Sequence, residues 1–177
     1  LALDESVGRV LEYLDRTGLA RNTVVVYMGD NGFSFGEHGL IDKRHAFEES
    51  MRVPMLVWAP GLVSPGATVQ AMVQNVDIAP TLLEIARAQA PNQHVFDGQS
   101  FLAQLRGKAA GRERSAVLYE YYWEWNYPHT PTQFALRSER YKYIFTHGVW
   151  DVDMFFDLQA DPQESRNLID DPAQQMT

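Results

Sequence analysis

The chain has 177 residues, no cysteine, and 15 basic against 23 acidic residues, which gives a formal net charge of −8. The absence of cysteine excludes a disulfide framework, a thiolate nucleophile and a cysteine-based zinc or iron–sulfur site. The acidic balance argues against sequence-independent binding of nucleic acid phosphates, and the apolar runs are too short to span a bilayer. The hydrophobic fraction of 45% is typical of a globular protein.

The first predicted element is an amphipathic helix over residues 3–17, because its apolar side chains recur at helical spacing. Gly18 follows where a helix often ends in a glycine. The run Val24–Met28 is β-branched and apolar on both faces, which predicts a buried parallel strand. Val53–Ala59 predicts a second buried strand. Helix followed by buried strand is the order of elements in an α/β fold.

Further along, Asp77–Ala86 is expected to be a helix with Asp77 at its N-cap, and Phe101–Arg106 a short helix. Short strands rich in aromatic residues follow: Ala116–Trp123, Gln133–Ser138, Tyr141–Thr146 and Met154–Leu158. Asp161-Pro162 has the pattern of a helix start. We therefore expect an α/β region over residues 1–112, followed over 113–177 by a small antiparallel sheet with a terminal helix.

Asp30 and Asn31 come directly after the first predicted strand. Carboxylate and amide oxygens on a strand-to-loop turn suit Ca²⁺ or Mg²⁺. The same Asp-Asn-Gly sequence is also typical of a turn that needs only backbone chemistry. From spacing alone the turn is favoured, and the metal site is the alternative.

Lys43 follows in the same long polar loop, where it could hold a sulfate or phosphate or neutralise an anionic leaving group. A surface lysine is the plainer alternative. His38 is a candidate anion contact or proton donor, or else a loop hydrogen-bonding residue. Glu48 and Glu49 are expected to be structural partners of the loop cations, which are Lys43, Arg44 and Arg52.

The aromatic segment Tyr119–Tyr127 has two interpretations. Alternate aromatic side chains could pack the small sheet, which we favour for most of them, or they could line a carbohydrate or aryl subsite. His129, in the proline-flanked turn that follows, is the residue of this region that we expect to contact substrate.

Together these motifs resemble the C-terminal half of the sulfatase family, which belongs to the alkaline-phosphatase-like superfamily. The matching segments run in order through practically the whole chain: Val24–Gly32, Gly36–Gly39, Lys43, Phe47–Pro54, Pro60-Gly61, Asn75–Leu83, Leu136–Ile144 and Phe156–Leu168. The resemblance implies that Asp30 and Asn31 are metal ligands, usually of Ca²⁺ with Mg²⁺ as the other option. It also implies that Lys43 contacts the sulfate ester near its leaving oxygen, with His38 in the matching loop.

Sulfatases use a formylglycine made within a Cys/Ser-x-Pro-x-Arg motif, and this chain contains no such motif. We expect the formylglycine, with the other metal-binding aspartates, in a missing N-terminal half, because the chain begins in the middle of an element. The expected function is that of a sulfuric ester hydrolase whose substrate is a sulfated small molecule or sulfated glycan. The N-terminal half of the same protein is the expected partner, and the fragment alone is expected to be inactive.

Two other functions stay open. One is a phosphonate or phosphate monoester hydrolase of the same superfamily, which shares the metal and lysine positions. The other is a non-catalytic module that binds sulfated glycans or packs as a structural partner. The sequence leaves the compartment open among periplasmic, secreted and cytoplasmic.

Overall fold

The computed structural model of the protein describes residues 1–90, 94–108, 114–148 and 152–173. The chain forms two compact units, which are described separately. The first contains Leu1–Met28 and Pro54–Arg112, and the second contains Gly29–Val53 and Glu113–Thr177. Residues 29–53, which hold most of the candidate site residues, therefore belong with the later part of the chain. The division into domains at residue 112 stays a prediction.

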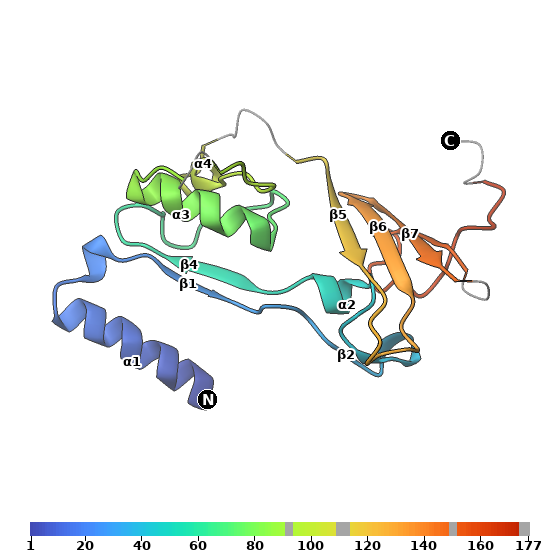
Figure 1. The fold of residues 1–177 in the computed structure, drawn as a ribbon. Helices are drawn as coiled ribbons and strands as arrows, with labels where there is room; N and C mark the ends of the chain where they lie inside the picture. Colours follow the sequence, from blue (N-terminus) through green and yellow to red (C-terminus); the bar gives the residue numbers. More distant parts are fainter. Residues whose placement is uncertain (91–93, 109–113, 149–151, 174–177) are drawn as a thin grey trace. The chain divides into compact units, whose positions relative to one another are not determined.

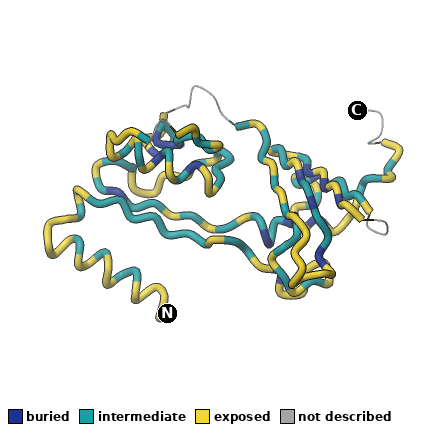
Figure 2. The backbone as a smooth tube through the Cα atoms, in the orientation of Figure 1, coloured by how far each residue is buried: buried dark blue, intermediate teal, exposed yellow. Residues whose placement is uncertain are grey.

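In the first unit, helix α1 (Ala2–Arg16) confirms the predicted amphipathic helix, and Gly18 follows it with a φ of +74°. Figure 2 shows that α1 is exposed over much of its length, and none of its residues is buried. A short 3₁₀ turn, η1 (Ala20–Asn22), leads from it to strand β1 (Val25–Met28). Among the described residues, no helix has the length and apolar character needed to cross a membrane.

Strands β1 and β4 (Met55–Trp58) form where strands were predicted, but they are neither parallel nor fully buried. They pair with each other in antiparallel fashion, with Val26 opposite Val57, and Leu56 is 65% exposed. A continuous apolar run is compatible with either pairing direction, so the sequence pattern could not decide between them.

The remaining elements of the first unit are η3 (Asn75–Asp77), α3 (Ile78–Ala86) and α4 (Leu102–Leu105). Helix α3 lies along the β1–β4 ribbon (Figure 1), where Val26 and Ile85 line the same small apolar cavity. Asp77 is buried, but its carboxylate does not cap α3. It accepts hydrogen bonds from the backbone N–H groups of Gln74 and Gln99, at 2.7 and 2.8 Å.

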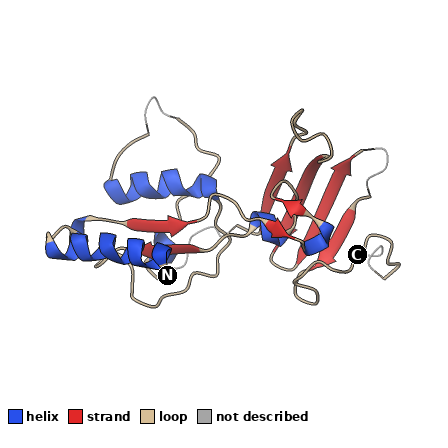
Figure 3. Cartoon of the chain, turned by 90° about the horizontal axis from the view of Figure 1, so that it is seen from below, coloured by secondary structure: helices blue, strands red, loops and turns tan. Residues whose placement is uncertain are grey.

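The second unit is built on an antiparallel sheet of four strands (Figure 3), as the sequence predicted, and the strands lie in the order β5-β6-β7-β8. Its strands are β5 (Ala116–Tyr121), β6 (Thr132–Ser138), β7 (Tyr141–His147) and β8 (Met154–Asp157). The preceding loop adds β2 (Ser34–Phe35), η2 (Glu37–Gly39), β3 (Ile41–Asp42) and helix α2 (Glu48–Met51).

The core of this unit joins the early loop to the sheet. Ala46 and Phe47, which precede α2, pack with Ala135 of β6, Ile144 of β7 and Phe156 of β8. Burial of these apolar side chains holds the loop that contains Lys43 against the sheet.

The predicted terminal helix is wrong for the residues that the structure describes up to 173, which form turns after β8. Glu164 takes a left-handed φ of +50°, which interrupts a right-handed helix. The Asp161 carboxylate accepts hydrogen bonds from the Ser165 hydroxyl and the Arg166 N–H instead of capping a first turn. Burial of the Glu164 side chain against the sheet outweighs the local helix signal.

Candidate functional site

Asn31 and Lys43 meet at one point of the second unit, although 12 positions separate them in the sequence. The Lys43 Nζ donates a hydrogen bond to the Asn31 Oδ1 at 3.0 Å. Asp30 lies beside them, and its Oδ1 accepts the Asn31 backbone N–H at 2.9 Å. The structure therefore brings together three of the residues that the sequence singled out: two hard oxygen donors and one cation.

Helix α2 holds the Asp30–Gly32 turn in place. The Gly32 N–H donates to the Ser50 carbonyl oxygen at 2.9 Å. A Cβ on Gly32 would collide with the backbone of Glu49, so only glycine permits this close approach. The turn that presents Asp30 and Asn31 is thus docked directly on the helix backbone.

Asp42 orders the chain on either side of Lys43. Its Oδ1 accepts the Lys43 backbone N–H at 2.7 Å and the Arg44 Nη1 at 2.5 Å. Burial acts to raise the pKa of Asp42, but these two hydrogen bonds and the Arg44 charge outweigh it and hold the pKa below its ordinary value. Asp42 therefore engages the backbone of Lys43, and the Lys43 ammonium group lies beside Asn31.

The turn that carries His129 contacts Asp42 and Arg44, the residues on either side of Lys43. The guanidinium carbon of Arg44 lies 3.2 Å from the centre of the Tyr127 ring, and the Thr130 hydroxyl donates to the Asp42 Oδ2 at 3.3 Å. His129 lies between Tyr127 and Thr130 and is exposed. Its predicted contact with substrate stays a prediction, but these contacts attach its turn to the strand next to Lys43.

The aromatic side chains of residues 119–127 divide between the two interpretations. Tyr119 packs against the core of the second unit, whereas Trp123 is 51% exposed and Trp125 81% exposed. The packing role therefore applies to the strand residue, and the exposed indoles remain available for other contacts.

His38 has two partners inside the loop. Its ring stacks on Phe47 with 3.8 Å between ring centres, and its Nε2 lies 3.2 Å from the Glu49 Oε2. The His38 side chain is only 14% exposed. These contacts make His38 part of the framework of the loop, and the substrate contact expected of it stays a prediction.

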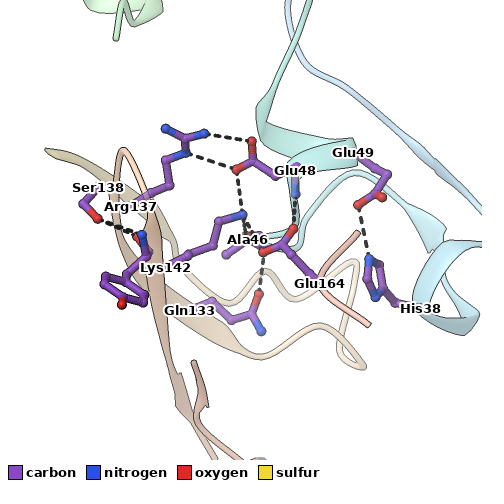
Figure 4. Close-up of polar contacts among 10 residues, drawn as sticks. His38, Ala46, Glu48, Glu49, Gln133, Arg137, Ser138, Lys142 and Glu164 are labelled. Atoms are coloured by element: carbon purple, nitrogen blue, oxygen red, sulfur yellow. Dashed lines mark hydrogen bonds and ion pairs between the residues drawn. The ribbon is translucent and has the colours of Figure 1, made fainter. Parts of the chain in front are cut away.

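Behind the loop lies a buried ion cluster that sequence reasoning missed (Figure 4). The Lys142 Nζ lies 2.9 Å from the Glu48 Oε1 and 2.7 Å from the Glu164 Oε1, and Arg137 pairs with Glu48 at 3.4 Å. Glu48 was expected to pair with a cation of its own loop, but its partners come from β6 and β7. The signal in the sequence was the alternation of β7, which places Lys142 on the inward face with Ile144.

A second candidate metal group is formed by His38, Glu49 and Glu164, whose ligand atoms lie within 4.8 Å of one another. Both carboxylate oxygens of Glu164 are already engaged, one by the Lys142 ammonium group and the other by the Glu48 N–H at 2.7 Å. Burial raises the pKa of Glu164, and the Lys142 charge only partly offsets this. Because both Glu164 oxygens are engaged and the Lys142 ammonium group lies 2.7 Å from one of them, this group is a poor candidate for binding a dication.

Most of the relatives that the comparisons name are sulfatases. A sequence model of the C-terminal region of N-sulphoglucosamine sulphohydrolase matches residues 36–177. An N-acetylglucosamine-6-O-sulfatase of Bacteroides thetaiotaomicron is 36% identical over 95% of this chain. A solved structure of a protein with its substrate D-glucosamine-2-N,6-O-disulfate aligns over 97% of this chain, with a TM-score of 0.86 and 35% identity.

A phosphonate monoester hydrolase of Agrobacterium radiobacter aligns over 98% of this chain and 36% of its own, with a TM-score of 0.85 and 24% identity, which shows a shared fold. The chain spans 30% of the length of the Bacteroides relative and 35% of the substrate-bound structure. In each case it corresponds to about a third of a longer protein.

Proposed function

The chain belongs to the sulfatase family of the alkaline-phosphatase-like superfamily, and from this membership we propose that the full-length protein hydrolyses sulfate esters. In this proposal the present chain supplies part of the metal and sulfate site through Asp30, Asn31 and Lys43. The chain contains no Cys/Ser-x-Pro-x-Arg motif, so the formylglycine nucleophile is proposed to come from another part of the protein.

The observation that carries the proposal is the 3.0 Å contact between the Lys43 Nζ and the Asn31 Oδ1. It joins an ammonium group to a hard oxygen donor at the end of a strand. In ester hydrolysis, negative charge grows on the departing oxygen as the bond breaks. A fixed ammonium group next to that oxygen stabilises the transition state more than the ground state, and this difference is what accelerates the reaction.

Members of the sulfatase family generally bind a metal ion, and the donors present here fit a hard dication such as Ca²⁺. Asp30 offers a carboxylate and Asn31 an amide oxygen, which can accept one N–H and still ligate a cation through its second lone pair. When bound, the dication would polarise the sulfate oxygens and orient the nucleophile. Ca²⁺ takes six to eight oxygens, so we expect the remaining ligands from outside this chain.

For the substrate we propose a sulfated amino sugar. The Bacteroides relative is named for the 6-O-sulfate of N-acetylglucosamine, and the substrate-bound structure holds a disulfated glucosamine. The turn with Trp125 and His129 is exposed and is a suitable surface for a sugar ring. It contacts Arg44 and Asp42, on either side of Lys43.

The proposal is tested with the full-length protein on N-acetylglucosamine-6-sulfate, an aryl sulfate and a phosphonate monoester. We expect the sulfated sugar to be turned over with the highest kcat/KM. Asp30→Asn should abolish activity on all three substrates and weaken Ca²⁺ binding measured by calorimetry. Asp4→Asn, on the exposed α1, is the matched control and should change neither.

The other outcomes separate the alternatives. Preference for the phosphonate monoester would favour the related hydrolase, whose fold this chain shares. Binding of sulfated glycans without turnover of any ester would favour a non-catalytic module and contradict the proposal.

A further inference from the structure

The ion cluster around Lys142 is balanced in charge, and its centre, the Lys142–Glu164 pair, is buried. Lys142 is 0% exposed, and its ammonium group contacts the carboxylates of Glu48 and Glu164 and the Ala46 carbonyl oxygen, the last at 3.0 Å. The contact with the Ala46 carbonyl oxygen is a hydrogen bond, and the contacts with the two carboxylates are ion pairs within 2.9 Å. With Arg137 on Glu48, two cations face two carboxylates.

Each partner of Lys142 belongs to the loop of the candidate site or to the turns after β8. Ala46 follows Lys43 by three positions, and Glu48 begins α2. Glu164 lies in the turns after β8 and accepts the Glu48 backbone N–H at 2.7 Å. Lys142 therefore ties the start of α2 and the chain just after Lys43 to the four-stranded sheet.

Ala46 is held from both sides of its backbone. Its carbonyl oxygen accepts from Lys142, and its N–H donates to the Gln133 Oε1 at 3.1 Å. Ala46 is 1% exposed, so water does not compete for these two bonds. Two side chains of neighbouring strands thus fix the position of the chain just after Lys43.

The other end of α2 contacts the turn that contains Asp30 and Asn31. The Ser50 carbonyl oxygen accepts the Gly32 N–H, and the Gly32 turn presents Asn31 to Lys43. Helix α2 is therefore held by the cluster at its start and supports the Asp30–Asn31 turn at its end.

Resting on the proposed function, we propose that Lys142 and Glu164 are positioning residues, which set the placement of Lys43 relative to Asn31 and hence to the leaving oxygen. Buried ion pairs are costly to desolvate, and apolar replacements are often as stable. A cluster of this kind is better explained by the geometry it imposes, because each ion accepts partners only in fixed directions.

The test is a double-mutant cycle in the full-length protein with Lys43→Ala and Lys142→Met, read out on sulfate esters of graded leaving-group pKa. A misplaced catalytic group costs up to about a hundredfold. We expect Lys142→Met to lower kcat by at least about tenfold, most for poor leaving groups, with little change in KM. In the Lys43→Ala background, Lys142→Met should lower kcat by less than about threefold.

Two further variants keep the test decisive if Lys142→Met folds poorly. Glu164→Gln keeps an acceptor for the Glu48 N–H while removing the charge that faces Lys142, and should reproduce the change in leaving-group dependence. Arg140→Met removes a cation of the β6–β7 turn that pairs with Asp157 of β8, and is the control. A purely structural role would lower stability and leave the leaving-group dependence unchanged, which would overturn the proposal.

Hydrogen exchange supplies a readout that does not depend on activity. Glu164→Gln should speed amide exchange in residues 42–50 more than in β6 or β7, because Lys142, which holds the Ala46 carbonyl oxygen, loses one of its charged partners. Unchanged exchange in 42–50 would overturn the positioning role whatever the enzyme does. If the wild-type protein hydrolyses no sulfate ester but exchange in 42–50 responds, the proposed function fails while the anchoring stands.

Discussion

The Cα of Gly32 lies against the backbone carbonyl of Glu49, with no room for a Cβ between them. This close approach lets the Gly32 N–H donate to the Ser50 carbonyl oxygen and keeps the turn tight. The turn then places the Asn31 side chain against Lys43. A change at Gly32 should therefore affect the candidate site without touching any of the side chains proposed to act in it.

Gly32→Ala should lower the stability of the full-length protein by about 1–3 kcal/mol, because the added methyl group must displace backbone atoms. It should also weaken Ca²⁺ binding, since Asp30 and Asn31 move with the turn. Thermal unfolding and calorimetry measure the two effects. Gly29→Ala is the matched control, because its methyl group would meet its nearest atoms at 3.4 Å, and equal effects from both variants would contradict the prediction.

Lys43→Ala should lower kcat on the order of a hundredfold in the full-length protein. The loss should grow as the leaving group becomes poorer, because activated aryl sulfates need less stabilisation of the departing oxygen. The measurement is kcat across a leaving-group series. Lys108→Ala, at an exposed position of the first unit, is the control. If the plots of log kcat against leaving-group pKa are parallel for wild type and Lys43→Ala, Lys43 does not act at the departing oxygen.

His129→Ala should raise KM for a sulfated sugar by about tenfold, the loss expected for one hydrogen bond, with little change in kcat. A contact with a remote part of the substrate is made equally in the ground and transition states. Small aryl sulfates should be unaffected. His147→Ala, which removes another exposed histidine of the same unit, is the control; a fall in kcat for His129→Ala with both substrate types would contradict a binding role.

Asp157→Asn should reduce stability at neutral pH and matter progressively less in acid. Hydrogen bonds from Arg140, the shorter at 2.7 Å, hold the pKa of Asp157 below its ordinary value of 3.8. Because the folded-state pKa is depressed, the charged carboxylate stabilises the fold above pH 3.8, and this contribution is lost as the pH falls through the folded-state pKa. Urea unfolding of the wild type and Asp157→Asn, from neutral pH to below pH 3.8, checks this prediction. A difference in stability that does not change with pH would rule out the Asp157 charge as its cause.

Local patterns in the sequence were sufficient for the elements that depend on local periodicity. The helical spacing of residues 3–17 and Gly18 after it predicted α1, and the alternating aromatic strands around Ser138–Arg140 predicted the β6–β7 hairpin. The ordered motifs from Val24 to Leu168 indicated the sulfatase family, because a motif can be read from residue types and spacing without the fold. A family model matches residues 36–177.

Tertiary structure alone decided the pairing of partners that lie far apart in the chain. The antiparallel pairing of β1 with β4, the turns after Asp161 and the partners of Glu48 each depend on which surface the rest of the chain presents. Apolar periodicity specifies that a strand or a helix has an inward face, but not what meets that face. Lys142 reaches Glu48 and Glu164 only because the register of β7 and the packing of α2 place one cation and two carboxylates in the same buried volume.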